Sequence, residues 1–336
     1  MIYLDHNATT PVAPEVCEAI LPYLSNEWGN PSSSYRFGAR LKTTIETARE
    51  QVAGILGASP REIVFTSCAT ESNNTAIHAA LRTQPHKRHL ITSAVEHSSV
   101  LNYCKALEAD GVCVTYLPVD RDGLLNLAEL ESAMTNETAL VSLMWAINET
   151  GVLFPVEKIA EICRSRGVLF HCDAVQAAGK IPMDVRNLPV DYLTISGHKL
   201  NAPKGVGALY VRRKTPFAPF IHGGHQERGR RGGTENVALI AGLGVAAELA
   251  RKGADQYAGK VRPLRDALES GILSEIPDTE LNGHSTERLA NTTNITFGGI
   301  EAEALLLMLD QMGVCASSGS ACLADSDEPS DRKSTR

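Results

Sequence analysis

Lys199 is the residue whose setting best suits chemistry. It lies in the motif SGHKLNAPKGVG (196–207), directly after an apolar run that is typical of a strand. A lysine at the rigid end of a sheet, flanked by Ser196 and His198 and followed by a Gly/Pro turn, is well placed to form a Schiff base with a cofactor. The alternative for this motif alone is an exposed lysine in a loop.

Asp173 is the second candidate, in the motif FHCDAVQAAGK (170–180). Acids at the ends of buried strands are seldom purely structural, because an unpaired charge there is costly or shifts its pKa. A carboxylate at this position would keep the pyridine nitrogen of pyridoxal phosphate (PLP) protonated, which makes the ring an electron sink. The alternative is an acid that caps the next helix.

Two further polar residues follow predicted strands. In IVFTSCATESNNTAIHAAL (63–81) a turn of small residues precedes a helix that we expect to begin near Thr70. Its free N–H groups and dipole would hold a phosphate, although Thr70 with Asn73 or Asn74 could be a plain helix cap. His97, in VEHSSV, could stack on a planar ring or move a proton, but a lone histidine is more often structural.

Cys322 lies in CASSGSACLADSDEPS (315–330), where nothing large is available to bury it. An exposed, mobile cysteine is a candidate nucleophile. The alternatives are a surface thiol or a metal or disulfide pair with Cys315, although two cysteines without a histidine partner make a poor zinc site.

The loop IHGGHQERGRRGGTEN (221–236) carries two histidines and three arginines. The histidines resemble half of a metal site, but no carboxylate stands at helical spacing from them. The arginines could bind an anion such as a cofactor phosphate, or the segment could be a solvated loop.

These residues need a scaffold, and apolar runs alternate with stretches of helical period along the chain. The runs are too continuous for strands with one wet face, so we predict a mostly parallel α/β sheet that is covered on both faces. The predicted strands are 62–65, 89–95, 111–117, 139–145, 168–175, 191–196 and 207–211.

The pattern predicts helices from Leu41 to a stop at Gly57 and from Val156 to Gly167. It changes at Gly232, beyond which we predict a smaller α+β domain. Its predicted elements are a long apolar helix at 232–250, a polar helix near 254–272, a strand at 291–297 and a helix at 301–313.

Composition narrows the class of protein. The chain has 336 residues, 43% of them hydrophobic and 21% charged, and a formal net charge of -7. We therefore expect a globular protein of two domains and no nucleic-acid partner, because binding phosphates needs a basic face. No apolar run is long enough for a membrane span, and the N-terminus carries no export signal. The eight cysteines are expected to be reduced and mostly buried.

Taken together, the motifs resemble the cysteine desulfurases of the nitrogen-fixation (NifS-like) type, within the class V aminotransferase-like PLP enzymes. The resemblance implies a fold of PLP-dependent transferase type I. A large domain at 13–235 would hold a mostly parallel seven-stranded sheet, and 1–12 with 236–336 would form the smaller α+β domain. The matching motifs, in order, are YLDHNATTP (3–11), GNPSS (29–33), FTSCATES (65–72), MWAINETG (144–151), HCDAVQAAGK (171–180), SGHKLNAPKGVG (196–207), GGHQERGRRGGTEN (223–236) and SSGSAC (317–322).

The resemblance also implies a role for each matching residue. Lys199 would bond covalently to PLP, and His97 would stack on the ring and assist proton transfer. Cys322 would accept the sulfur, and Asn148 would help to hold the substrate carboxylate. The remaining cofactor residues would be Asp173 at the pyridinium nitrogen, Gln176 at the ring hydroxyl, Ala69 beside the cofactor, Thr70, Ser196 and His198 at the phosphate, and Thr234 reaching in from the partner of a homodimer.

The implied reaction removes sulfur from L-cysteine and leaves L-alanine and a persulfide on Cys322. The sulfur would pass in the cytoplasm to an iron–sulfur scaffold protein, in particular for nitrogenase maturation. No metal site is expected in the chain alone, although Cys322 could contact a transferred iron–sulfur cluster. The alternatives are another class V enzyme, such as a selenocysteine lyase or an aminotransferase, and an inactive truncated fragment.

The sequence departs from the family pattern at two places. Ile147 stands where the family often has a second asparagine. After Cys322 the chain reads LADSDEPS and then DRKSTR, where the family continues through a further helix and strand and supplies an arginine for the substrate carboxylate. We therefore expect the smaller domain to be incomplete and no residue of this chain to match that arginine.

Overall fold

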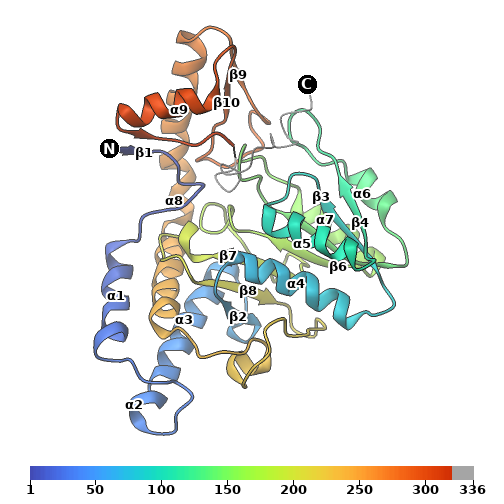
Figure 1. Ribbon diagram of the computed structural model, residues 1–336, viewed down its shortest axis with the longest axis vertical. Coiled ribbons are helices and arrows are strands. Elements are labelled where there is room, and N and C mark those ends of the chain that lie inside the picture. The colour runs from blue at the N-terminus through green and yellow to red at the C-terminus, as the bar shows by residue number, and fades with distance from the viewer. Residues whose placement is uncertain (320–336) are drawn as a thin grey trace.

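A seven-stranded sheet forms the centre of the protein in the computed structural model, which describes residues 1–319 (Figure 1). The strand order is β2-β8-β7-β6-β5-β3-β4, and only β8 runs against its neighbours. All seven predicted strands are confirmed, as is the mostly parallel sheet. Their bounds are β2 Ile63–Thr66, β3 His89–Ser93, β4 Cys113–Leu117, β5 Thr138–Met144, β6 Leu169–Asp173, β7 Tyr192–Ser196 and β8 Gly207–Val211.

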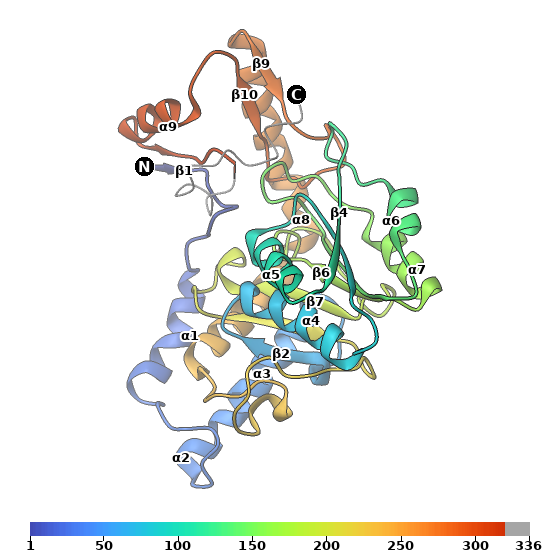
Figure 2. The ribbon, with the colours of Figure 1, turned by 45° about the vertical axis from the view of Figure 1, so that its right-hand side comes forward.

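Helices cover both faces of this sheet, as the continuous apolar strands predict. One apolar cluster packs α4 (Ala69–Thr83) and α5 (Ser98–Ala109) on one face. A larger cluster packs α3 (Leu41–Leu56), α7 (Val156–Arg166) and α8 (Val237–Glu275) on the other. Figure 2 shows the sheet between these layers.

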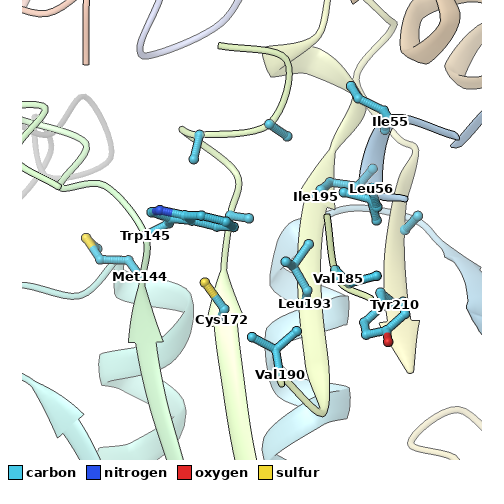
Figure 3. Packing of buried hydrophobic residues seen from close by; sticks show 14 of the residues in the cluster. Ile55, Leu56, Met144, Trp145, Cys172, Val185, Val190, Leu193, Ile195 and Tyr210 are labelled. Atoms are coloured by element: carbon cyan, nitrogen blue, oxygen red, sulfur yellow. The ribbon is translucent and has the colours of Figure 1, made fainter. Parts of the chain in front are cut away.

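The larger cluster fills the space beneath the carboxyl ends of β5 and β6. Trp145, at the end of β5, is 5% exposed and lies beside Cys172 of β6 (Figure 3). Leu193 of β7 is fully buried in the same cluster. This packing fixes the strand ends from which the candidate residues project.

The carboxyl ends of the parallel strands meet along one edge of the sheet. β6 ends at Asp173 and β7 ends at Ser196, and the two strands are hydrogen-bonded neighbours. Because the polar ends of parallel strands point the same way, residues that follow them are brought together.

A smaller group of elements follows α8, which runs from the layer beside the large sheet to this group (Figure 1). Its strands form two short sheets, β1 with β11 and β9 with β10. The bounds are β1 Ile2–Tyr3, β9 Thr279–Leu281, β10 Ile295–Phe297, α9 Ala302–Gln311 and β11 Val314–Cys315.

The prediction of two helices at 232–250 and 254–272 is wrong, because one helix, α8, spans Val237–Glu275. Gly253 has open space around it and does not interrupt the helix. A single glycine costs only about 1 kcal/mol in a helix, which the packed N-terminal half of α8 outweighs. Pro263 also lies inside the helix.

The remaining elements complete the periphery. No helix within residues 1–319 combines the length and the apolar character needed to cross a membrane. The remaining bounds are α1 Pro14–Ser25, α2 Arg36–Ala39, α6 Leu127–Ala133 and the short 3-10 turns η1 Pro60–Glu62, η2 Gly197–Lys199 and η3 Gln226–Gly229.

Candidate active site

One cavity at the strand ends gathers nearly all of the predicted site residues. Its lining comes from the ends of β5, β6 and β7, the first turn of α4 and the N-terminal segment on one side, and from α8, β9, β10 and α9 of the smaller group of elements on the other. The predicted residues in it are Ala69, Thr70, His97, Asn148, Asp173, Gln176, Ser196, His198 and Lys199.

Lys199 closes the η2 turn that directly follows β7. Its Nζ donates hydrogen bonds to the carbonyl oxygens of Asn7 and, at 2.7 Å, Ala8. The N-terminal segment therefore crosses the cavity and holds the amine in it. The turn can be this tight because Gly197 has no side chain: a Cβ there would meet a Cγ of Val206 at 2.8 Å.

Asp173 is 6% exposed, at the carboxyl end of β6. Its Oδ1 accepts from the backbone N–H of Val175 at 3.0 Å, and its Oδ2 accepts from Nδ2 of Asn73 at 2.7 Å. Each carboxylate oxygen has further lone pairs, so the group can still accept a hydrogen bond from a protonated ring nitrogen. The alternative role as a helix cap does not describe it, because the residues from 174 to 180 form turns.

Gln176 is held on both sides. Its Nε2 donates to the carbonyl oxygen of Asn7 at 3.0 Å, and its Oε1 accepts from Nζ of Lys180 at 3.1 Å. Burial, with a smaller contribution from the charge of Lys199, lowers the pKa of Lys180 to about 7. The lysine partner fixes the amide so that Gln176 turns its NH2 group toward the cavity.

A phosphate fits the ends of α4 and β7. The first turn of α4, a helix of 15 residues, begins at Ala69 and Thr70, so its free N–H groups face the cavity. Ser196 Oγ is buried and has no hydrogen-bond partner within residues 1–319. Burial, with smaller contributions from the charge of Lys199 and other nearby cations, lowers the pKa of His198 to about 4, so its imidazole is neutral at pH 7. An unpartnered hydroxyl beside a helix N-terminus is what an oxyanion ligand requires.

His97 begins α5 as its N-cap. Its Nδ1 accepts from the backbone N–H of Ser99 at 3.1 Å and lies 2.8 Å from Ser99 Oγ. The histidine therefore has a structural role as a cap and also lines the cavity. A structural role for His97 is therefore compatible with the predicted role beside the cofactor ring.

Asn148 also lines the cavity. Its Oδ1 is buried and has no hydrogen-bond partner in the part of the chain that the structure describes. Its backbone carbonyl accepts from Nδ2 of Asn7 at 3.1 Å. The neighbouring Ile147, where the family often has asparagine, is 3% exposed and packs in the apolar core.

One predicted residue within the described part of the chain lies outside this cavity. Thr234 lines a separate depression with Trp28 and Asn30. Cys322 lies outside the described residues. Cys315 is half-buried in β11, which pairs with β1.

The prediction that most cysteines are buried is wrong for the seven described, all of which are free. Only Cys104, Cys163 and Cys172 are buried. Burial raises the pKa of Cys104 and of Cys163 to about 12, so these thiols stay protonated and unreactive at neutral pH.

The arginine-rich loop binds carboxylates of the protein itself. Arg231 Nε lies 2.9 Å from Glu71, in the first turn of α4, and Arg228 pairs with Glu46 at 3.1 Å. Arg230 donates to a backbone carbonyl. These pairings give the arginines partners within the protein, so they do not favour the anion site, while the exposed His222, His225 and Arg228 agree with the solvated-loop alternative. Within residues 1–319 no group of three or more His, Cys, Asp and Glu side chains could hold a metal ion.

Sequence reasoning missed three residues of the cavity's hydrogen-bond network. Asn7 stands in the quoted motif YLDHNATTP, and Lys180 lies four residues after Gln176 in QAAGK. Asn73 follows Thr70 by three residues, so both lie on one face of α4. The spacing of Asn73 from Thr70 could have indicated that both lie near the site. The sequence alone does not show which groups Asn7, Lys180 and Asn73 bond to.

A lysine after one strand, a carboxylate at the end of its parallel neighbour and a helix N-terminus around the same cavity define a PLP-dependent enzyme of fold type I. The Aminotransferase class-V family matches residues 2–333, and the chain belongs to that family, among its cysteine desulfurases.

Individual relatives are similar to this chain in sequence or structure over most of their length. The "Cysteine desulfurase" of Trichormus azollae is 58% identical over 330 residues, which is 98% of this chain and 82% of that relative. The solved structure of a "NIFS-LIKE PROTEIN" matches with a TM-score of 0.91 and 40% identity, over 94% of this chain and 87% of that one. The structure named "SspA in complex with cysteine" matches with a TM-score of 0.87 and 38% identity, over 99% and 94%.

Proposed function

We propose that the chain is a PLP-dependent cysteine desulfurase, which converts L-cysteine to L-alanine and leaves the sulfur as a persulfide on Cys322. The observation that carries the proposal is the convergence of Lys199, Asp173 and His97 on one cavity. Membership among the cysteine desulfurases, and a similar structure whose name records a complex with cysteine, support the choice of substrate.

The residues of the cavity fit the cofactor. Lys199 would carry it, Asp173 would accept from its ring nitrogen and Gln176 would donate to its ring hydroxyl. The unpartnered Ser196 Oγ, His198 and the first turn of α4 at Ala69 and Thr70 would bind its phosphate. When bound, PLP supplies an electron sink for the electrons released at the substrate Cα.

The chain's own residues would then bind the substrate and move its protons. Lys199, once released from the cofactor, would be the base nearest the substrate Cα. His97 would hold or deliver a proton at the substrate sulfur side of the ring. Asn148, whose Oδ1 is buried and unpartnered, would use its amide to orient the substrate.

The sulfur step balances without an added oxidant or reductant. The bond between Cβ and sulfur of the substrate breaks, and a bond between that sulfur and Sγ of Cys322 forms. L-Cysteine and a thiol thereby become L-alanine and a persulfide, so the carbon skeleton is reduced as the sulfur pair is oxidised. A thiolate is required because it, and not the thiol, is the nucleophile.

The wider setting belongs to the same proposal. The enzyme would act in the cytoplasm as a homodimer in which Thr234 completes the partner's site, and it would pass sulfur to an iron–sulfur scaffold protein, in particular for nitrogenase maturation. The proposed domains are 13–235 and 1–12 with 236–336. Two observations support that division: α8 begins at Val237, and the short sheets are separate from the large one.

The test compares the enzyme with two variants after addition of PLP and then L-cysteine. Lys199→Ala should lose the visible absorbance of lysine-bound PLP and produce no alanine. Cys322→Ala should keep that absorbance and lose the persulfide, which is measured as one added sulfur atom in the protein mass. Cys113→Ala, which changes an exposed thiol far along the chain, is the matched control and should behave as the unaltered enzyme.

Three outcomes would contradict the proposal. Unchanged sulfur transfer in Cys322→Ala would remove the role of that cysteine. Conversion of bound PLP to its amine form with release of a 2-oxo acid would show an aminotransferase, and a preference for selenocysteine would show a lyase.

A further inference from the structure

Asn73, Ser99 and Asp173 form a buried hydrogen-bonded group behind His97. Asn73 lies on α4, Ser99 lies in the first turn of α5, and Asp173 ends β6. Asn73 is fully buried, Ser99 is 7% exposed and Asp173 is 6% exposed. The two helices pack side by side on one face of the sheet (Figure 1), so the group joins three elements.

Asn73 uses both hydrogens of its amide in this group. Its Nδ2 donates to Asp173 Oδ2 at 2.7 Å and to Ser99 Oγ at 2.9 Å. The opposite orientation of the amide would place its oxygen against a carboxylate oxygen, and an ionised carboxylate can only accept. The amide orientation is therefore set by Asp173.

The hydroxyl hydrogen of Ser99 is not used in the bond from Asn73, and His97 Nδ1 lies within hydrogen-bond distance of it. Because Ser99 Oγ accepts from Asn73, its own O–H is available for His97 Nδ1 at 2.8 Å. The backbone N–H of Ser99 also points to that nitrogen, at 3.1 Å. A backbone N–H can only donate, so Nδ1 is an acceptor and the proton of the neutral imidazole lies on Nε2.

We propose that Asn73 and Ser99 are positioning residues that fix the ring orientation and the Nε2–H tautomer of His97 and link that state to the carboxylate of Asp173. The relevance of this arrangement to catalysis rests on the proposed function. The one amide of Asn73 donates both to Asp173, which would accept from the cofactor nitrogen, and to Ser99, whose hydroxyl reaches His97 Nδ1, so the orientations of these side chains are coupled.

A purely structural role explains less of the geometry. The backbone N–H of Ser99 would cap α5 on His97 without any contribution from Asn73. Asn73 Oδ1, meanwhile, is buried without a hydrogen-bond partner within residues 1–319, which costs free energy. The unpartnered oxygen of Asn73 lowers stability, whereas its two N–H donors hold Ser99 and Asp173 in place. The geometry therefore favours a positioning role for Asn73.

The test is the tautomer of His97, measured in the apoprotein by ¹⁵N–¹H NMR of the imidazole, with His97→Gln to assign its signals. The unaltered protein should show an acceptor-type Nδ1 signal. Ser99→Ala and Asn73→Leu, which keep the 3.1 Å bond from the backbone N–H but lose the positioned hydroxyl, should move it toward the averaged signal of two tautomers. Ser99→Thr, which keeps the hydroxyl, should restore it.

Asn74→Leu is the matched control, because it is the same substitution one position along α4 and the hydrogen bonds of the group do not involve Asn74. It should leave the signal unchanged. A protonated Nδ1 in the unaltered protein, or no change in Ser99→Ala, would overturn the proposal. If Asn73→Leu does not fold, the Ser99→Ala and Ser99→Thr pair decides.

Failure of the proposed function would look different. PLP absorbance and alanine release are measured on the same preparations. An intact tautomer in a protein that makes no alanine would contradict the desulfurase and leave the positioning role in place. Normal alanine release together with an unaffected His97 tautomer in Ser99→Ala would support the desulfurase and contradict the positioning role.

Discussion

Lys180 is a buried lysine beside the amine on which the proposed reaction depends. Its Nζ has Gln176 Oε1 as a partner at 3.1 Å, and it is 7% exposed. Burial first, and Lys199 second, lower its pKa from 10.5 to about 7. The folded protein therefore binds this proton less tightly than the unfolded chain does.

The sign of the resulting pH dependence follows from linkage. Between pH 7 and pH 10.5 the unfolded chain holds the proton and the folded protein does not, so folding stability should rise with pH across this window. In Lys180→Met that contribution is absent. The melting temperature of the apoprotein variant, minus that of the unaltered apoprotein, should fall as the pH is raised from 7 to 10. A constant difference would contradict the lowered pKa.

At the scale of elements, a buried ion pair attaches the arginine-rich loop to the large sheet. Glu227 of η3 accepts two hydrogen bonds from Arg49 of α3, at 2.6 and 2.7 Å, and a third from the backbone N–H of Phe65 in β2 at 2.9 Å. Both charged side chains are 3% exposed. Glu227 adopts a φ of 47°, which only strong local contacts can maintain.

Glu227→Ala should destabilise the fold by about 3–5 kcal/mol, because the buried Arg49 then keeps only its 3.0 Å ion pair with Glu46, whose side chain is 50% exposed. The measurement is chemical denaturation followed by circular dichroism. Glu131→Ala is the matched control: it breaks the exposed pair with Arg166, in which both side chains are 49% exposed, and should cost at most about 1 kcal/mol. Equal losses in the two variants would contradict the assigned role of the buried pair.

The elements also show what could be read from the sequence. Strands such as Gly207–Val211 were predictable because burial on both faces requires a continuous apolar run. Asp173 and Lys199 were predictable because parallel strands end at one edge. The partners of the arginine loop were not, because Glu71 and Glu46 lie far away in the sequence and the pairing depends on how the elements pack. For the same reason, the hydrogen bonds of Asn73 to Ser99 and Asp173 could not be predicted.

At the scale of the whole molecule, the N-terminal segment joins the large sheet to the smaller group of elements. The side chain of Asn7 donates to Thr292 Oγ1 at 2.9 Å and accepts from Asn291 Nδ2 at 2.9 Å. Its backbone carbonyl accepts from Gln176 and Lys199. The position of Lys199 therefore depends on contacts from both parts of the molecule.

Thr234 lies outside the cavity of its own chain, which the proposed homodimer explains. In a heterodimer of Lys199→Ala and Thr234→Ala chains, one site combines both substitutions and the other has neither. The heterodimer should therefore have about half of the activity of the unaltered dimer, and an equal mixture of the two chains, in which about half of the dimers are heterodimers, about a quarter. The measurement is alanine release after the chains are mixed and refolded or coexpressed. If Thr234 acted within its own chain, mixing would restore nothing.

The central claim is that the Lys199 cavity transfers sulfur from L-cysteine to Cys322. Its most direct measurement is a single exposure of the PLP-loaded enzyme to L-cysteine without a reductant, with alanine and protein-bound sulfur quantified together. The account predicts equal amounts of both, with the sulfur on Cys322, and neither product in Lys199→Ala. Alanine without sulfur on Cys322, or a 2-oxo acid in place of alanine, would contradict it.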